Sequence, residues 1–263
     1  MGRQVGALVA THLSDRRRSL LAWGVPLGLW SAFVVLIFPS VEGALSKAIE
    51  NYPPALKEAF GIGELANVEQ YLQAEMLSLI VPLALGYLAV RAVASGLSGA
   101  AESGRLDVLL SAPVSRSRLA AASFAATAVE LAIVLVLTVI LTGLGSLVSG
   151  ADLSFASALA GYADVWPLAL VFAGLGVIAA GFSLRTSVVT GAVSGVLVSM
   201  YVIDLIGKLD PGLSGIRYAS VFKYYGNAIE DGIEPIAFIG VTAIAIIFAA
   251  VGAWLFERRD LSA

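Results

Sequence analysis

The chain has 263 residues, of which 59% are hydrophobic and only 13% are charged. Soluble globular domains carry roughly a quarter charged residues, so the composition excludes a water-soluble globule and indicates a membrane protein. The net charge of −3 argues against a nucleic-acid-binding protein. The absence of cysteine excludes disulfides, thiolate metal sites and cysteine nucleophiles, and the single histidine, His12, cannot form a multi-histidine metal site.

Six apolar stretches are long enough to cross a hydrocarbon core about 30 Å thick. They lie at residues 20–38, 72–97, 119–148, 166–184, 188–206 and 236–256. Pro39 closes the first stretch, which is too long for the apolar core of a signal peptide. We expect an all-α integral membrane protein with six transmembrane helices and a single transmembrane domain over residues 1–263.

The distribution of basic residues predicts the orientation of the chain. Six spans place both termini on one side of the membrane, and that side carries eleven of the sixteen Lys and Arg residues. By the positive-inside rule this side is cytoplasmic. The abundance of Ala, Gly, Val and Arg over Lys is consistent with the cell membrane of a prokaryote.

Two long segments lie on the predicted outer side. Residues 40–70 carry apolar residues at helical spacing on either side of Pro53 and Pro54, which predicts two short helices at the membrane surface. Residues 207–234 include an aromatic cluster after Pro211, which predicts a short dipping helix before the last span.

The cytoplasmic loop at 98–118 is the most informative segment outside the membrane. Leu106, Leu109 and Leu110 have the spacing of one helix face, Pro113 ends the pattern, and Ser115 can cap the third span. A short amphipathic helix at this place could be pushed by a cytoplasmic motor protein. It could equally lie on the inner leaflet, and periodicity does not separate the two alternatives.

The sequence contains no recognisable active site. It has no GxxxxGK[ST] phosphate-binding loop, and its four lysines all lie in the predicted outer segments. Gly174-x-Gly176-x-x-Ala179 matches a loose dinucleotide fingerprint, but it lies inside an apolar span, where helix packing explains it better. We therefore expect no cofactor in this chain and no enzymatic activity, so energy must come from a partner or an ion gradient.

The loop pattern Glu102-x-Gly104-x-Leu106-Asp107-x-Leu109-Leu110-x-x-Pro113-Val114-Ser115-Arg116 resembles the cytoplasmic loop of ABC-2-type exporter permeases. Residues 15–19, 52–61 and 256–261 are similar to other parts of the same family. The resemblance implies a permease that pairs with a second copy or a paralogue and binds two ATPase subunits, which hold ATP and Mg. It also implies an N-terminal amphipathic helix within 1–18, a coupling helix near 102–110 and short outer helices near 220–231.

On this basis one set of residues is assigned to contact with the ATPase subunits. The set is Glu102, Gly104, Arg105, Leu106, Asp107, Leu109, Leu110, Pro113 and Arg116.

A polar stripe follows one face of the third span, and Glu130 is its charged member. The stripe comprises Ser123, Thr127, Glu130, Thr138, Thr142 and Gly145. A carboxylate inside a bilayer must be neutral, paired or exposed to a wet cavity. The stripe therefore faces the translocation path or a dimer partner, or else Glu130 pairs with Arg91 and only locks the helices together.

The fifth span carries the small-residue ridge Gly191-x-x-x-Gly195-x-x-x-Ser199, with Ser194 and Tyr201 on an adjoining face. Such ridges let helices approach closely, most often within one protein. Internal packing is therefore the commoner explanation, while the family resemblance favours a dimer seam. The candidates for the path or seam are Thr127, Glu130, Thr138, Gly191, Ser194, Gly195 and Tyr201.

The sequence thus favours a permease subunit of an ABC exporter that moves an amphiphilic small molecule, lipid or peptide outward. Two alternatives stay open. One is an ion-coupled secondary transporter or channel with Glu130 as its ion site, and the other is a membrane assembly factor that transports nothing.

Overall fold

The computed structural model describes residues 16–50, 53, 67–104 and 115–258, with the side chains of 45–50 excepted. Every regular element in this part of the chain is a helix. Six of these helices are long and apolar enough to cross a membrane, which confirms the predicted fold class. The side of the membrane on which the termini lie is not defined by this finding.

The six spanning helices follow one another along the chain. They are α2 (Arg17–Glu50), α5 (Ile80–Glu102), α7 (Arg116–Ser149), α8 (Phe155–Phe182), α9 (Thr186–Leu209) and α11 (Pro235–Glu257). The short helix α4 (Val68–Leu72) and the π-helical turn η1 (Gln73–Leu77) precede α5, so the second apolar span covers Val68–Glu102. Asn67 caps α4 by accepting a hydrogen bond from the backbone N–H of Gln70 at 2.9 Å.

Two predicted helix boundaries are wrong. The sequence predicts an end at Pro39, but α2 continues through it to Glu50. A proline inside a helix removes one backbone hydrogen bond, and membrane helices tolerate this better than soluble ones. The fourth span is predicted to start at residue 166, whereas α8 begins at Phe155, where Ser154 accepts from the backbone N–H of Ser157 at 3.3 Å.

The two segments that the sequence predicts on the outer side differ from the prediction in the number and type of their helices. Residues 207–234 form two 3₁₀ helices, η2 (Pro211–Ala219) and η3 (Val221–Tyr224), and a single α-helical turn, α10 (Ala228–Asp231), rather than one dipping helix. Of the two short helices predicted within 40–70, the first falls on the continuation of α2 as far as Glu50. The second, after Pro53 and Pro54, falls mainly on residues outside the described part of the chain.

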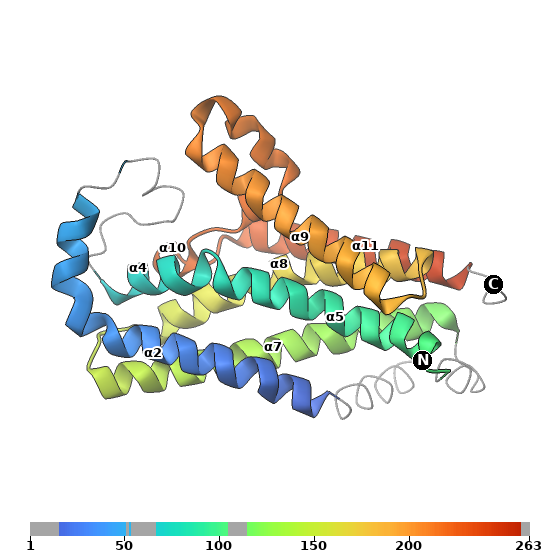
Figure 1. Ribbon diagram of the computed structural model, residues 1–263, viewed down its shortest axis with the longest axis horizontal. Helices are drawn as coiled ribbons and strands as arrows, with labels where there is room; N and C mark the ends of the chain where they lie inside the picture. The colour runs from blue at the N-terminus through green and yellow to red at the C-terminus, as the bar shows by residue number, and fades with distance from the viewer. Residues whose placement is uncertain (1–15, 51–52, 54–66, 105–114, 259–263) are drawn as a thin grey trace.

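The long helices lie side by side along one axis, except that α9 leans away from the others and η2 returns beside it (Figure 1). The N-terminal half of α9 touches the bundle through one narrow row of buried residues, Val189, Val193 and Leu197. The other helices share a continuous apolar core that includes Tyr162, Phe172 and Phe256. Helix α9 is therefore the spanning helix with the least lateral support (22% of its apolar window is buried).

Helices α2 and α7 meet along a row of small residues that we call the α2–α7 seam. Gly24 faces Leu137, Gly28 faces Leu141, and Ala32 faces Gly145. Both sets of residues recur every four positions, and the residue numbers increase in the same direction on both helices. The two helices therefore run parallel. The sequence analysis overlooked this ridge of α2, although its spacing is the same small-xxx-small pattern that drew attention to α9.

We predict that Gly145→Ala destabilises the fold, because the added methyl would lie 2.7 Å from the Ala32 carbonyl oxygen and backbone cannot move aside easily. Overpacking of this kind costs about 1–3 kcal/mol. Gly143→Ala is the matched control on the same helix, since its methyl meets only ordinary contact with Phe155 at 3.6 Å. Thermal unfolding in detergent should separate the two variants, and equal stability would contradict the close approach at the seam.

Candidate functional site

A buried ion pair joins the start of α2 to the middle of α7. The Nη1 atom of Arg16 lies 2.9 Å from Oε2 of Glu130, and their side chains are 12% and 1% exposed. Ser19 Oγ donates to the other carboxylate oxygen at 2.9 Å. Arg16 also donates to Thr127 Oγ1 at 3.1 Å and to the carbonyl of Ala92 in α5. One guanidinium therefore joins the start of α2 to both α5 and α7.

The alternative that Glu130 pairs with Arg91 is wrong, because its partner is Arg16. Arg91 is exposed on α5, and the residue that follows it, Ala92, offers only its carbonyl to Arg16. Arg16 precedes the apolar stretch and reads from sequence as one of three consecutive cytoplasmic arginines. The available signal was the spacing of Arg16 and Ser19, which places both side chains on one face of a helix.

A glycine makes room for this ion pair. A methyl group on Gly96 would lie 2.8 Å from Arg16 Nη2 and 2.6 Å from Ser123 Oγ. Ser123 Oγ is buried without a hydrogen-bond partner among the described residues. The hydroxyl of Ser123 and the guanidinium of Arg16 thus share the space that Gly96 leaves open.

The remaining polar residues of α7 form a second buried group. Thr142 Oγ1 lies 2.6 Å from Ser31 Oγ of α2, and Ser31 also contacts the Tyr162 hydroxyl of α8. Thr138 and Thr142 donate to carbonyls one turn earlier in their own helix, at 2.9 and 2.8 Å. In the absence of water, such groups are stable only when they bond to one another. The polar stripe is therefore covered by α2 and α8 within a single protomer.

The small-residue ridge of α9 is not packed inside the protomer, so the expectation of internal packing is wrong. Added methyl groups on Gly191 and Gly195 would meet no atom within 4 Å, and Ser199 is exposed. The adjoining face differs from the ridge. Tyr201 packs edge-on against Phe222 with ring centroids 5.5 Å apart, and Ser194 Oγ is buried without a hydrogen-bond partner among the described residues.

A second buried carboxylate fastens η2 to the outer part of α9. Asp204 is 3% exposed, and its oxygens lie 2.9 Å from Arg217 Nε and 3.0 Å from Lys208 Nζ. Gly207 leaves the space that the side chain of Arg217 occupies. Lys208 lies on α9 with Asp204, whereas Arg217 lies on η2, so the Arg217–Asp204 pair joins α9 and η2 into a hairpin.

The stems of the loop between α5 and α7 are each tied to another helix. Glu102, the last residue of α5, accepts from Thr186 N at 3.2 Å and from Thr186 Oγ1 at 2.6 Å. Ser115 caps α7 by accepting from the backbone N–H of Arg118 at 3.4 Å, as the sequence predicts. Glu257, at the end of α11, accepts from the backbone N–H of Ser117 at 2.6 Å.

Three of the nine residues assigned to ATPase contact lie in the described part of the chain: Glu102, Gly104 and Arg116. Gly104 has a φ of 69°, a left-handed conformation that suits the residue after a helix end. Six others lie outside the described residues: Arg105, Leu106, Asp107, Leu109, Leu110 and Pro113. The amphipathic helix expected within 1–18 also lies outside them, apart from residues 16–18.

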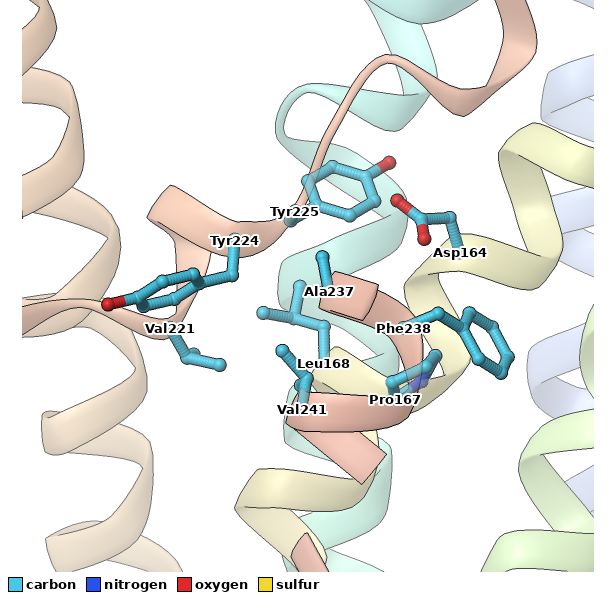
Figure 2. A pocket seen from close by; sticks show the side chains of 9 residues that line it. All are labelled: Asp164, Pro167, Leu168, Val221, Tyr224, Tyr225, Ala237, Phe238 and Val241. Carbon is cyan, nitrogen blue, oxygen red and sulfur yellow. The ribbon is translucent and has the colours of Figure 1, made fainter. Parts of the chain in front are cut away.

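A small pocket lies between η3 and the outer ends of α8 and α11, with Asp164 and Tyr225 at one rim (Figure 2). Its internal volume is about 10 Å³, the room for one water molecule. Asp164 accepts from the backbone N–H of Gly226 at 3.3 Å, and the Tyr225 hydroxyl donates to the Leu77 carbonyl at 3.0 Å. Burial raises the pKa of Tyr225 well above its ordinary value, so this hydroxyl keeps its proton as a structural donor.

Two adjoining apolar grooves run along α7 beside α8, with volumes of about 230 and 530 Å³. They share Ala132, Val136 and Trp166. Trp166 Nε1 donates to the Ala128 carbonyl at 2.9 Å, so its polar atom is already satisfied. The grooves suit hydrocarbon and offer no site for an ion. Among the described residues there is also no group of three or more His, Asp or Glu side chains that could hold a metal.

The sequence matches the model of a known family over nearly the whole length of the chain. Residues 8–257 fit the model of the family described as "Multidrug efflux system permease Rv1217c, C-terminal domain". The chain belongs to this family of ABC-2-type exporter permeases. A comparison with curated proteins returned no match. Together with the six apolar helices, membership makes the chain a multi-pass membrane permease, and the family implies ATPase partners.

We predict that breaking the ion pair destabilises this permease. Glu130→Gln leaves the guanidinium of Arg16 buried without its counter-charge, and loss of one partner of a buried pair costs about 3–5 kcal/mol. The double variant Arg16→Gln with Glu130→Gln removes both charges and should recover most of the loss. Unfolding midpoints in detergent measure both effects.

Arg91→Gln is the control, because it removes a cation from the same part of the bundle without touching Glu130. Its stability should stay within about 0.5 kcal/mol of the parent, as for an exposed substitution. A loss in Arg91→Gln equal to that in Glu130→Gln would instead assign the carboxylate to Arg91.

Proposed function

We propose that the chain is the membrane-spanning subunit of an ATP-driven exporter. It moves an amphiphilic small molecule, lipid or peptide outward, with ATP and Mg bound by two partner ATPase subunits. The family match over residues 8–257 carries this proposal. The chain has no phosphate-binding loop of its own, and the apolar grooves beside α7 are consistent with a hydrocarbon-bearing cargo.

The proposed orientation places both termini and the loop between α5 and α7 in the cytoplasm of a prokaryotic cell. The arginine distribution supports it, because the ends of α5 and α11 and the starts of α7 and α9 form one end of the bundle. Arg116, Arg118, Arg185 and Arg258 lie at that end. Positive residues near span ends favour the cytoplasmic side.

The loop between α5 and α7 is proposed as the contact with the ATPase subunits. Its two stems end at Glu102 and Ser115, and both stems carry hydrogen bonds to other helices. A push on the loop therefore reaches α9 and α11 as well as the two helices that it joins.

The ridge of α9 is proposed as the seam with a second permease, either an identical copy or a paralogue. Gly191 and Gly195 are open on a helix that has little lateral support in the protomer. Without a hydrophobic driving force in lipid, small residues promote association by close backbone contact. Ser194 adjoins the ridge, but its Oγ is buried within the protomer rather than open on the ridge.

Thr127, Glu130 and Thr138 can line a path only after α2 separates from α7, since α2 covers them. The ion-coupled alternative loses support, because both oxygens of Glu130 already accept hydrogen bonds from Arg16 and Ser19. Tyr201 packs inside its own protomer and is better placed to brace α9 against η3 than to face a partner.

The function is tested by purifying the permease from native membranes. We expect two ATPase subunits with phosphate-binding loops to co-purify, and vesicles containing the complex to move amphiphilic dye only with Mg–ATP. Vanadate should stop the movement, and an ionophore that collapses ion gradients should not. Movement that follows an ion gradient and ignores vanadate would assign the permease to the secondary carriers.

The seam is tested with single cysteines, which need no prior engineering because the chain contains none. Gly195→Cys should cross-link two permease subunits in membranes, since this position is open on α9. Gly240→Cys is the matched control, because it is an equally open glycine on α11. Equal cross-linking at both positions would show non-specific collision and remove the α9 seam.

A further inference from the structure

Helix α9 lacks an N-terminal cap from its own sequence. Its N-cap residue, Arg185, makes no side-chain hydrogen bond to the first turn. The missing acceptor is supplied by Glu102, which lies 84 residues earlier in the chain, at the end of α5. Its two oxygens accept the backbone N–H and the hydroxyl of Thr186. A carboxylate at this place also complements the positive end of the helix dipole.

Further contacts join the end of α5 to the segment around the start of α9. We call this set of contacts the α5–α9 clamp. It consists of Ser98, Gly99 and Glu102 of α5, with Ser183 at the C-terminal end of α8 and Thr186 at the start of α9. Ser98 is fully buried and donates to the carbonyl of Ser183 at 3.2 Å. A methyl group on Gly99 would meet Thr186 Oγ1 at 3.4 Å, so the start of α9 lies directly beside this turn of α5.

The clamp lies where a force on the loop between α5 and α7 would be transmitted to α9. Glu102 is the last residue of α5 before the loop, and the start of α9 lies beside it (Figure 1). Beyond the clamp, the inner half of α9 touches the bundle through a single row of buried residues, and its far part moves with η2 through Asp204. Displacement of Glu102 is therefore carried along α9 more readily than along any better-packed helix.

We propose that Glu102 is a positioning residue that transmits nucleotide-driven movement of the cytoplasmic loop to α9. This inference rests on the proposed function, because it needs an ATPase to move the loop. It goes further by naming the link and the helix that receives the motion. Glu257, which binds the N-terminus of α7 from α11, holds the other stem.

The experiment follows α9 directly in the complex with its ATPase subunits. A bimane dye is attached to a single cysteine at Leu209, the last residue of α9, or at Ile233 before α11 as the control position; the two side chains are 38% and 36% exposed. Addition of Mg–ATP and vanadate should shift bimane emission at Leu209. Glu102→Ala should reduce that shift about fivefold, the equilibrium effect of losing one helix cap of ordinary strength.

A matched variant separates transmission from simple helix capping. Glu69 also accepts from the backbone N–H at the start of another helix, Ser154 of α8 at 3.1 Å, but at the opposite end of the bundle. Glu69→Ala should leave the shift at Leu209 unchanged. Glu102→Gln keeps one acceptor oxygen and should be intermediate. Thr186→Val, which retains the backbone bond, serves if Glu102→Ala does not assemble, and should also reduce the shift.

Three results would overturn the inference. They are a full shift at Leu209 in Glu102→Ala, no shift in the parent complex, or an equal loss in Glu69→Ala with a lower unfolding midpoint in both. If the parent permease binds no ATPase at all, the proposed function fails first and the inference falls with it. That failure is distinguishable because it appears before any variant is made.

Discussion

The packing of α2, α5 and α7 depends on one contact, the ion pair between Arg16 and Glu130. A bilayer offers no water to satisfy a charge, so a buried carboxylate must find its partner inside the protein. Arg16 satisfies Glu130, Thr127 and the carbonyl of Ala92 together and so joins α2, α7 and α5. Neither charge is compensated without the other. The pair therefore keeps α2 packed over the polar stripe of α7.

The remaining polar contacts divide the molecule into a well-packed part and a loosely attached one. Helices α2, α5, α7, α8 and α11 share the apolar core, and the Ser31–Thr142–Tyr162 group joins three of them. Helix α9 is tied to α5 at its start by Glu102, packs on the bundle through one row of buried residues, and carries η2 through Asp204. This division suits an exporter permease, since one helix can move while the others keep their packing.

Composition and hydropathy were sufficient to predict six spans, because apolar length alone decides which segments cross a bilayer. Helix ends were predicted less well, as at Pro39, because membrane helices tolerate proline. The polar stripe was found, but its partner was not. Whether Arg16 or Arg91 meets Glu130 depends on how two helices are rotated, and the sequence of either helix does not contain that information. The same limit applies to Gly195, because the sequence does not contain which face of α9 packs on the bundle.

The seam between α2 and α7 has a mechanical consequence. Small residues recur every four positions on α2, and their counterparts on α7 follow the same interval. A slip of one helical turn, about 5.4 Å, would bring Ala32 opposite Leu141, whose side chain leaves no room for a methyl group at Gly28. The seam therefore fixes the register of the two helices, and sliding in that direction is blocked by steric collision.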